Sequence, residues 1–313
     1  GGVLTLAAGA SAAGPVTAGQ VMSAADIAFL TYTPPANEHG NAYDTFTFSV
    51  QDDGGTLFGG VDYDQTPNTM TIDITSVNDA PDGTDITIST LEDTAYTFAA
   101  ADFGFTDVND DNPVNNFQNV IITTLPASGI LELSGVAVTA GQVIAVGDIP
   151  NLTFTPDLDE YGAGYTDFTF QVQDDGGTAN TGVDIDPTPN TVTFDVVAVN
   201  DAPDGADITL TTREDEPLTF TAADFGFSDA NDNPDPHNLQ SVIITTVPAI
   251  GTFELAAGAS APGIVTAGQV ISAADIPFLT FTPVANEHGA GYADFTFQVV
   301  DDGGTANGGV DSD

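Results

Sequence analysis

The chain has 313 residues and carries 46 acidic side chains against one base, Arg213, so its formal charge is −45. This charge argues against a nucleic acid partner, because phosphate binding needs Lys and Arg, and against attraction to an anionic membrane surface. Cysteine is absent, which excludes disulfides and thiolate metal sites. The 20 Phe and seven Tyr, together with many β-branched residues, predict a folded protein rather than a disordered acidic tail.

The chain shows no sequence feature of a membrane span. No apolar run reaches the ~18 residues of a spanning helix, so we expect no membrane insertion. The first residues, Gly1-Gly2-Val3-Leu4, lack the charged region and the cleavage site of a signal peptide. Secretion is therefore inferred from other features of the chain.

A block of about 122 residues repeats along the chain. Residues 1–77 match the later part of the block, residues 78–199 form a complete copy, and residues 200–313 form a copy that stops before its last strand. The motifs that recur are Asn78-Asp79-Ala80-Pro81 as Asn200-Asp201-Ala202-Pro203, Glu92-Asp93 as Glu214-Asp215, and Asp102-Phe103-Gly104-Phe105 as Asp224-Phe225-Gly226-Phe227. We therefore expect three domains with these boundaries, cut from a longer array.

Strand signals dominate each copy. Phe168, Phe170 and Val172 alternate with polar residues, a period-two pattern that is typical of half-buried antiparallel strands. In the complete copy we predict strands near residues 86–89, 96–99, 119–124, 130–133, 143–155 (interrupted), 167–173 and 191–198, with one short turn near residues 99–102. Seven short strands in about 120 residues predict an all-β fold: seven-stranded antiparallel Greek-key β-sandwiches stacked end to end.

Acidic loops converge where two copies meet. Antiparallel strands send successive loops to opposite ends of a sandwich, so Glu92-Asp93 and Asp157-Leu158-Asp159-Glu160 share one end with the linker Asn200-Asp201. The facing end of the next copy holds Asp229-Ala230-Asn231-Asp232-Asn233 and Asp301-Asp302-Gly303-Gly304. Calcium takes six to eight oxygen ligands, many of them carboxylates. We therefore predict structural Ca²⁺ at each junction.

The candidate ligands are the acidic and amide side chains of these loops and linkers in all three copies. They are Glu38, Asp52, Asp53, Asn78, Asp79, Glu92, Asp93, Asp107, Asn109, Asp110, Asp159, Glu160, Asp174, Asp175, Asn200, Asp201, Glu214, Asp215, Asp229, Asn231, Asp232, Asp301 and Asp302.

Two loops also resemble the start of an EF-hand loop. Asp107-Val108-Asn109-Asp110-Asp111 and its later counterpart at residues 229–233 carry the first three ligand positions. The sixth position is Asn112 or Pro234 instead of Gly, and the twelfth is Gln instead of Glu. A full EF-hand is rejected, and a partial calcium loop stays open.

Simpler interpretations compete with the metal sites. Acidic loops are often solvated turns. The sequence Asn-Glu-His-Gly at residues 37–40 and 286–289 could suggest zinc, but the middle copy has Tyr161 in place of the histidine, which favours a loop without metal. His237 has no histidine nearby in the sequence, and we expect it to be exposed.

The motif order resembles that of cadherins, and more closely that of the bacterial cadherin-like tandem repeats of large surface adhesins. Val199-Asn200-Asp201-Ala202-Pro203 is similar to the cadherin linker, without its leading Asp and one Asn. Glu92-Asp93 corresponds to the early Glu of that family, Glu160 to its mid-domain acidic motif, and Asp229-Ala230-Asn231 to its acidic pair. The resemblance implies calcium-rigidified, Ig-like β-sandwiches in a secreted adhesin or matrix protein.

No nucleophile–base pair, phosphate loop or paired acid–base carboxylates are evident in the sequence, so we expect no enzyme. The expected role is an extracellular spacer at the bacterial cell surface, with Ca²⁺ and neighbouring repeats as partners. Identical chains in a fibre, or an unknown cell-surface ligand, are further possible partners. Two alternatives stay open: a self-assembling subunit of a filament or surface layer, and a carbohydrate-binding module, which would need exposed aromatic side chains.

Overall fold

The computed structural model describes residues 1–110, 114–232 and 236–313. Its regular structure is nearly all β-strand in several sheets, which confirms the all-β prediction. The helical elements are short 3₁₀ turns: η1 (Ile27–Phe29), η2 (Leu57–Gly59), η3 (Ala100–Phe103), η4 (Val146–Asn151), η5 (Ala179–Thr181), η6 (Ala222–Phe225), η7 (Ile276–Phe278) and η8 (Ala306–Gly308). None of the helices in these ranges has the length and apolar character needed to cross a membrane.

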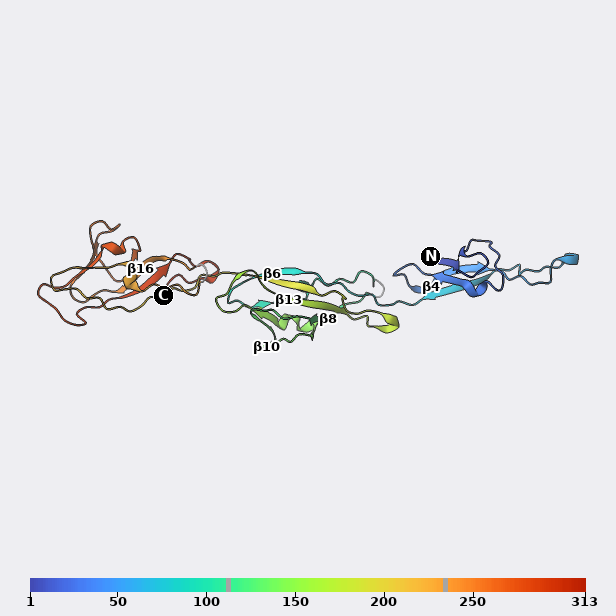
Figure 1. Cartoon of the computed structure of the whole chain (residues 1–313), viewed down its shortest axis with the longest axis horizontal. Coiled ribbons are helices and arrows are strands. Elements are labelled where there is room, and N and C mark those ends of the chain that lie inside the picture. Colours follow the sequence, from blue (N-terminus) through green and yellow to red (C-terminus); the bar gives the residue numbers. More distant parts are fainter. Residues whose placement is uncertain (111–113, 233–235) are drawn as a thin grey trace.

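Strands pair only within three stretches of the described chain, which we call the first (1–77), second (78–199) and third (200–313) segments. Figure 1 shows the three groups of strands one after another along the long axis of the molecule. In the first segment β1 (Val3–Leu6) pairs with β2 (Gly14–Pro15) and β3 (Leu30–Thr33), and β4 (Gly40–Phe48) pairs with β5 (Asn68–Ile74).

The second segment contains two sheets. A four-stranded sheet has the order β10-β9-β12-β7, and a five-stranded sheet has the order β11-β8-β13-β14-β6. The bounds are β6 (Ile86–Leu91), β7 (Tyr96–Thr97), β8 (Phe117–Ile122), β9 (Ile130–Leu133), β10 (Val136–Ala137), β11 (Gln142–Ala145), β12 (Leu152–Thr155), β13 (Gly162–Asp174) and β14 (Asn190–Val197). All pairs are antiparallel except β14 with β6, which run parallel, a departure from the purely antiparallel expectation.

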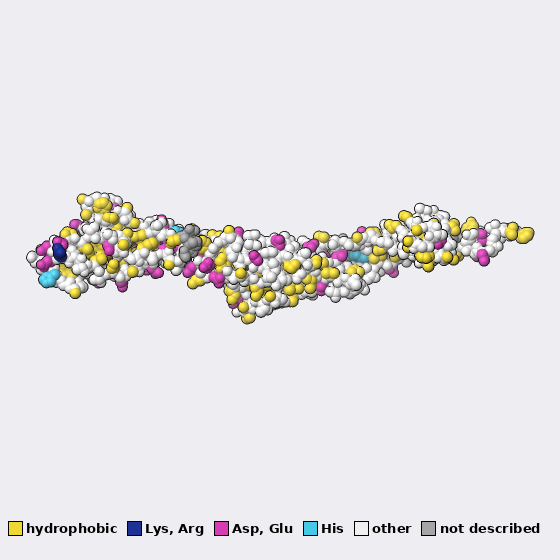
Figure 2. Space-filling view, viewed as in Figure 1, with side chains coloured by type: hydrophobic (Ala, Val, Ile, Leu, Met, Phe, Trp, Pro, Cys, Tyr) yellow, Lys and Arg dark blue, Asp and Glu magenta, His cyan; other side chains and the backbone are white. Residues whose placement is uncertain are grey.

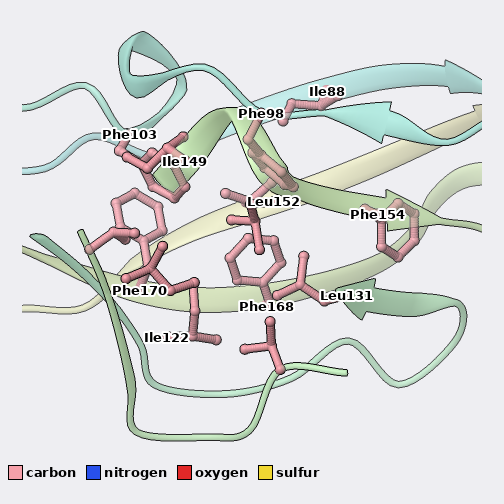
Figure 3. Packing of buried hydrophobic residues seen from close by; sticks show 14 of the residues in the cluster. Ile88, Phe98, Phe103, Ile122, Leu131, Ile149, Leu152, Phe154, Phe168 and Phe170 are labelled. Carbon is pink, nitrogen blue, oxygen red and sulfur yellow. The ribbon is translucent and has the colours of Figure 1, made fainter. Parts of the chain in front are cut away.

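Both sheets of the second segment contribute to one core. Phe168, Phe170 and Val172 on β13 are fully buried, as their alternation with Thr169 and Gln171 predicts. Figure 3 shows Phe168 and Phe170 facing side chains such as Leu152 on β12. The Phe154 and Phe194 rings stack at 3.8 Å between centroids and so join the two sheets. This core fixes where the loops at each end of the segment emerge.

The third segment repeats this arrangement with fewer strands. Its sheets have the orders β15-β20-β17-β18 and β19-β16-β21. The bounds are β15 (Leu218–Thr219), β16 (Leu239–Thr246), β17 (Thr252–Leu255), β18 (Gly263–Ile264), β19 (Gln269–Ser272), β20 (Leu279–Thr282) and β21 (Thr296–Asp301). Residues 208–213, the counterpart of β6, form no strand. Among the described residues β6 pairs with β14 alone, and residues 200–313 do not include the sequence equivalent to β14.

The recurring Asp-Phe-Gly-Phe motif has a structural role. Asp102 accepts a hydrogen bond from the backbone amide of Ala99 at 2.8 Å and so caps η3, the short turn that we expected near residues 99–102. Phe103 is fully buried, and Gly104 ends the turn with a φ of +58°. The motif therefore anchors a turn against the core and lies outside the acidic loops that carry the candidate ligands.

Candidate metal centre

The end of the second segment places three acidic elements together. Glu92 follows β6, and its carboxylate accepts a hydrogen bond from the backbone amide of Val199, just after β14. The neighbouring Asp93 accepts a hydrogen bond from the amide of Asp159 at 3.2 Å. Both Asp93 and Asp159 have a left-handed backbone, with φ of +55° and +56°, which reverses the chain tightly at each turn. The parallel pairing of β6 with β14 is what brings Glu92 to the linker.

Carboxylates from the second and third segments meet at this end. Ligand oxygens of Glu92, Asp201 and Asp232 all lie within 4.8 Å of one another. A second group, within the same limit, consists of Asp93, Asp159 and Asp201. Asp201 belongs to both groups, and its backbone amide donates to Asp232 at 3.2–3.3 Å. We call this set of five residues the junction cluster.

Several oxygens in or beside the cluster are buried without a hydrogen-bond partner in the described part of the chain. Glu92 is 3% exposed, and its Oε2 atom has no partner. Oδ2 of Asp201 and Oδ1 of Asp229, a residue 8% exposed, are also unpaired. Buried polar atoms are nearly always hydrogen-bonded, so three such oxygens together require an explanation. A bound cation would satisfy them.

No Arg or Lys side chain pairs with these acids in the described part of the chain. The single Arg or Lys of the chain, Arg213, is largely exposed and pairs with Glu216 at 3.8 Å. Two like charges 4 Å apart near a protein surface repel by about 4 kcal/mol at an effective dielectric of ~20. In Figure 2 acidic side chains are spread along the whole visible face of the molecule. Within the junction cluster, by contrast, Glu92 and Asp232 are each 3% exposed and their carboxylates lie close together.

The pKa shifts in the cluster reflect this crowding. The pKa of Asp201 is raised to about 6, first by burial and then by the carboxylates of Asp159 and Asp232. Burial also raises the pKa of Glu92, with a further contribution from Asp201. The pKa of Asp232 is raised by burial and by Asp229. Without a cation, these groups hold protons more tightly than ordinary carboxyls do.

The prediction that His237 is exposed was wrong. Its side chain is 33% exposed, and its Nδ1 atom lies 3.4 Å from Asp232 and 3.6 Å from Asp229. The three residues form a further group of potential ligands within 4.8 Å. The backbone amide of His237 also donates to Asp229 at 2.6 Å. The spacing of a single histidine after Asp229 carried no signal of this arrangement.

Two predicted metal ligands, Asp174 and Asp301, accept hydrogen bonds from the side chains of the linker asparagines. Asn200 donates its side-chain amide to both oxygens of Asp301, at 3.1 and 3.3 Å, and to the carbonyl of Val310 at 2.7 Å. Asn78 makes the same contacts with Asp174 at 3.1 and 3.2 Å. Asp174 and Asp301 are each 1% exposed. Each therefore fixes the linker to the segment that follows it.

A related group lies between the first and second segments. Both oxygens of Asp107 are buried without a hydrogen-bond partner in the described residues, and the pKa of Asp107 is raised to about 6 by burial, then by Asp110 and Asp174. The amide of Asp79 donates to Asp110 at 2.7 Å. Glu38, Asn109 and Asp110 line a cavity here with Asp79.

The remaining candidates lie apart from these groups or bond elsewhere. Asp175 and Asp302 are exposed and accept hydrogen bonds from the amides of Asn116 and Asn238, each at 2.7 Å. Glu160 and Asn231 are exposed, as are Asp52 and Asp53. Glu214 contacts His288 at 3.1 Å, and Asp215 accepts from the amide of Asn286 at 3.0 Å. Asp111, Asn112, Asn233 and Pro234 lie outside the described residues.

The arrangement can bind a hard divalent cation through oxygen atoms. The five carboxylates of the junction cluster come from two adjacent segments and form two groups that share the linker residue Asp201. Buried oxygens of Glu92, Asp201 and Asp229 have no hydrogen-bond partner among the described residues. No family model, curated protein or solved structure matches the chain.

Proposed function

We propose that the chain is a non-catalytic segment of an extracellular repeat array, a calcium-rigidified spacer in a bacterial surface adhesin or fibre. In this proposal each segment is a Greek-key β-sandwich repeat, and the repeats stack end to end. One observation carries the proposal: Asp201 of the third segment has carboxylate oxygens within 4.8 Å of those of Glu92 in one group and of Asp93 and Asp159 in another, so acids of both segments meet at this residue.

Calcium fits this region better than other common ions. It takes six to eight oxygens at 2.3–2.6 Å and tolerates irregular geometry, whereas magnesium demands an octahedron and keeps several waters. Glu92, Asp93, Asp159, Asp201 and Asp232 would hold the ion through carboxylate oxygens. The unpaired Oε2 of Glu92 and Oδ2 of Asp201 are the strongest candidates for direct ligands.

The mechanical effect follows from the electrostatics. Without calcium the carboxylates of the two segments repel one another and favour separation of the repeats. With calcium the same carboxylates bind a common ion, so the hinge loses freedom and the repulsion disappears. Proline at residue 203 restricts the linker further by fixing one backbone dihedral. The array would then extend and stiffen to present another domain away from the cell.

A chelator experiment tests the proposal. Small-angle scattering and calorimetric melting would be measured in 2 mM Ca²⁺ and again in excess EGTA, at one ionic strength. We expect EGTA to lower the melting temperature and to shorten the maximum dimension as the array becomes flexible. Scattering profiles and melting curves that do not change with the chelator would refute the proposal.

A further inference from the structure

The third segment carries an imidazole ring where the second segment has a side-chain amide. With the offset of 122 residues, His237 corresponds to Asn115, Asp229 to Asp107 and Asp232 to Asp110. Asn115 donates its side-chain amide to Oδ1 of Asn78. Oδ1 of Asn200, the counterpart of Asn78, is buried without a partner among the described residues. The histidine has therefore replaced a linker contact with a ring nitrogen directed towards two carboxylates.

The surroundings of His237 Nδ1 suit a metal ligand better than a hydrogen bond. The atom is buried, and Asp232 and Asp229 lie 3.4 and 3.6 Å from it, beyond the range of about 2.7–3.2 Å that is usual for an N–H···O hydrogen bond. Bonds of about 2.0–2.1 Å place two ligands of a tetrahedral zinc ion about 3.3–3.4 Å apart. The side chain of Asp229 is 1% exposed, and its Oδ1 atom is also unpaired.

We propose that Asp229, Asp232 and His237 form a binding site for a zinc-class divalent transition metal, which the corresponding position between the first and second segments lacks. Imidazole nitrogen favours zinc and its neighbours in the transition series, whereas calcium takes oxygen ligands. The metal would be bound by two carboxylates and one imidazole, with its remaining positions open to water. The site rests on the proposed function only in that Asp232 also belongs to the junction cluster.

The junction between the first and second segments can be compared with the one that contains His237. His39 lines its cavity beside Glu38 but falls in no group of three potential ligand atoms within 4.8 Å among the described residues. Asp107 and Asp110 are present there, and Asn115 stands at the histidine position. The two junctions thus share the acidic pair and differ in the nitrogen ligand.

Reciprocal substitutions test the site. His237→Asn restores the residue type of the second segment and should fold, because Asn115 already occupies the same environment with a satisfied side chain. Isothermal titration with ZnCl₂ would be performed on calcium-free chain in a non-coordinating buffer at pH 7.5. We expect one zinc site in the original chain, at least 10-fold weaker binding in His237→Asn, and a second site in Asn115→His.

The outcomes separate this site from the proposed function. Identical zinc titrations for the original chain and His237→Asn would overturn the site and leave His237 as an ion-pair partner of the acids. Zinc binding that depends on His237 supports the site even if EGTA leaves the melting curve unchanged, a result that would refute only the calcium proposal. Calcium-dependent melting with zinc binding indifferent to His237 would refute only the zinc site.

Discussion

The side-chain amide of Asn200 donates to both carboxylate oxygens of Asp301, a residue 101 positions further along the chain. The same bond joins Asn78 to Asp174. In both copies the aspartate is the first residue of Asp-Asp-Gly-Gly, and its carboxylate also accepts from the amide of the first glycine, at 2.7 or 2.8 Å. The linker is thus fixed to the following segment by hydrogen bonds that need no metal.

Removal of this linker contact should destabilise the third segment. Asn200→Ala would remove the side-chain donor to Asp301, which is 1% exposed, and leave its Oδ2 atom without that hydrogen bond, while the amide of Gly303 still donates to Oδ1. An unsatisfied buried polar group costs about 1–3 kcal/mol. Urea unfolding in EGTA should show this loss, and Asn78→Ala should have a similar effect on the second segment. A change below about 0.5 kcal/mol would show that Asp301 finds another donor.

Glu92 should contribute to calcium binding, whereas its counterpart Glu214 should not. Glu92 is 3% exposed and lies against Asp201 and Asp232, while the Glu214 side chain is 50% exposed. Glu92→Gln removes one charge from the cluster, so we expect at least 10-fold weaker calcium binding by titration calorimetry. Glu214→Gln is the matched control and should leave the affinity unchanged. Equal affinities for both variants would remove Glu92 from the site.

The calcium-free chain should lose stability as the pH rises from about 4 to 6. The pKa values of Asp201 and Asp107 are raised from 3.8 to about 6 in the folded chain. In this window the folded chain binds more protons than the unfolded chain, so the free energy of unfolding falls with pH and levels off above it. The pKa values of Asp26 and Asp275 are lowered in the folded chain, so below this window these two groups make the free energy of unfolding rise with pH.

Melting curves in EGTA at pH 4.5, 5.5 and 6.5 would check this trend. Calcium should reverse it, because the metal binds the deprotonated carboxylates and its stabilisation grows with pH. A melting temperature in EGTA that rises across this range would contradict the assignment of crowded, buried acids at the junctions.

The turn at Gly104 should tolerate no side chain. A Cβ atom at this position would lie 2.6 Å from Cβ of Thr84, and φ is +58°. Gly104→Ala therefore combines backbone strain with a clash, and we expect a loss of about 1–3 kcal/mol in the second segment. Gly135→Ala, at a φ of +76° with no atom within 4 Å of the new Cβ, is the control that measures strain alone. Equal losses in both variants would show that the clash costs nothing.

The strands could be predicted from the sequence because burial alternates along them. Phe168, Phe170 and Val172 alone locate β13, and the interrupted stretch 143–155 became β11, η4 and β12. The start of β13 was missed because it begins at Gly162, beyond a bulge between Gly162 and Thr166 that breaks the alternation. No local pattern in the sequence predicts the parallel pairing of β6 with β14.

The candidate site was predictable in its location but not in all its members. Loop polarity placed Glu92, Asp93, Asp201 and Asp232 at one junction, and these residues do lie together. The choice between Asp159 and Glu160 depended on a left-handed turn at Asp159, which directs its backbone to Asp93 and leaves Glu160 exposed. His237 was missed because a single histidine eight residues after Asp229 matches no metal-ligand spacing.

The most direct test is the distance distribution across the junction between the second and third segments. The chain has no cysteine, so Val136→Cys and Ile264→Cys, at positions 69% and 64% exposed, can each carry one nitroxide label. Pulsed electron–electron double resonance then measures the distances between the two labels. The account predicts a narrow distribution in calcium and a broad one in EGTA. Equally broad, or equally narrow, distributions in the two conditions would contradict a junction held by calcium.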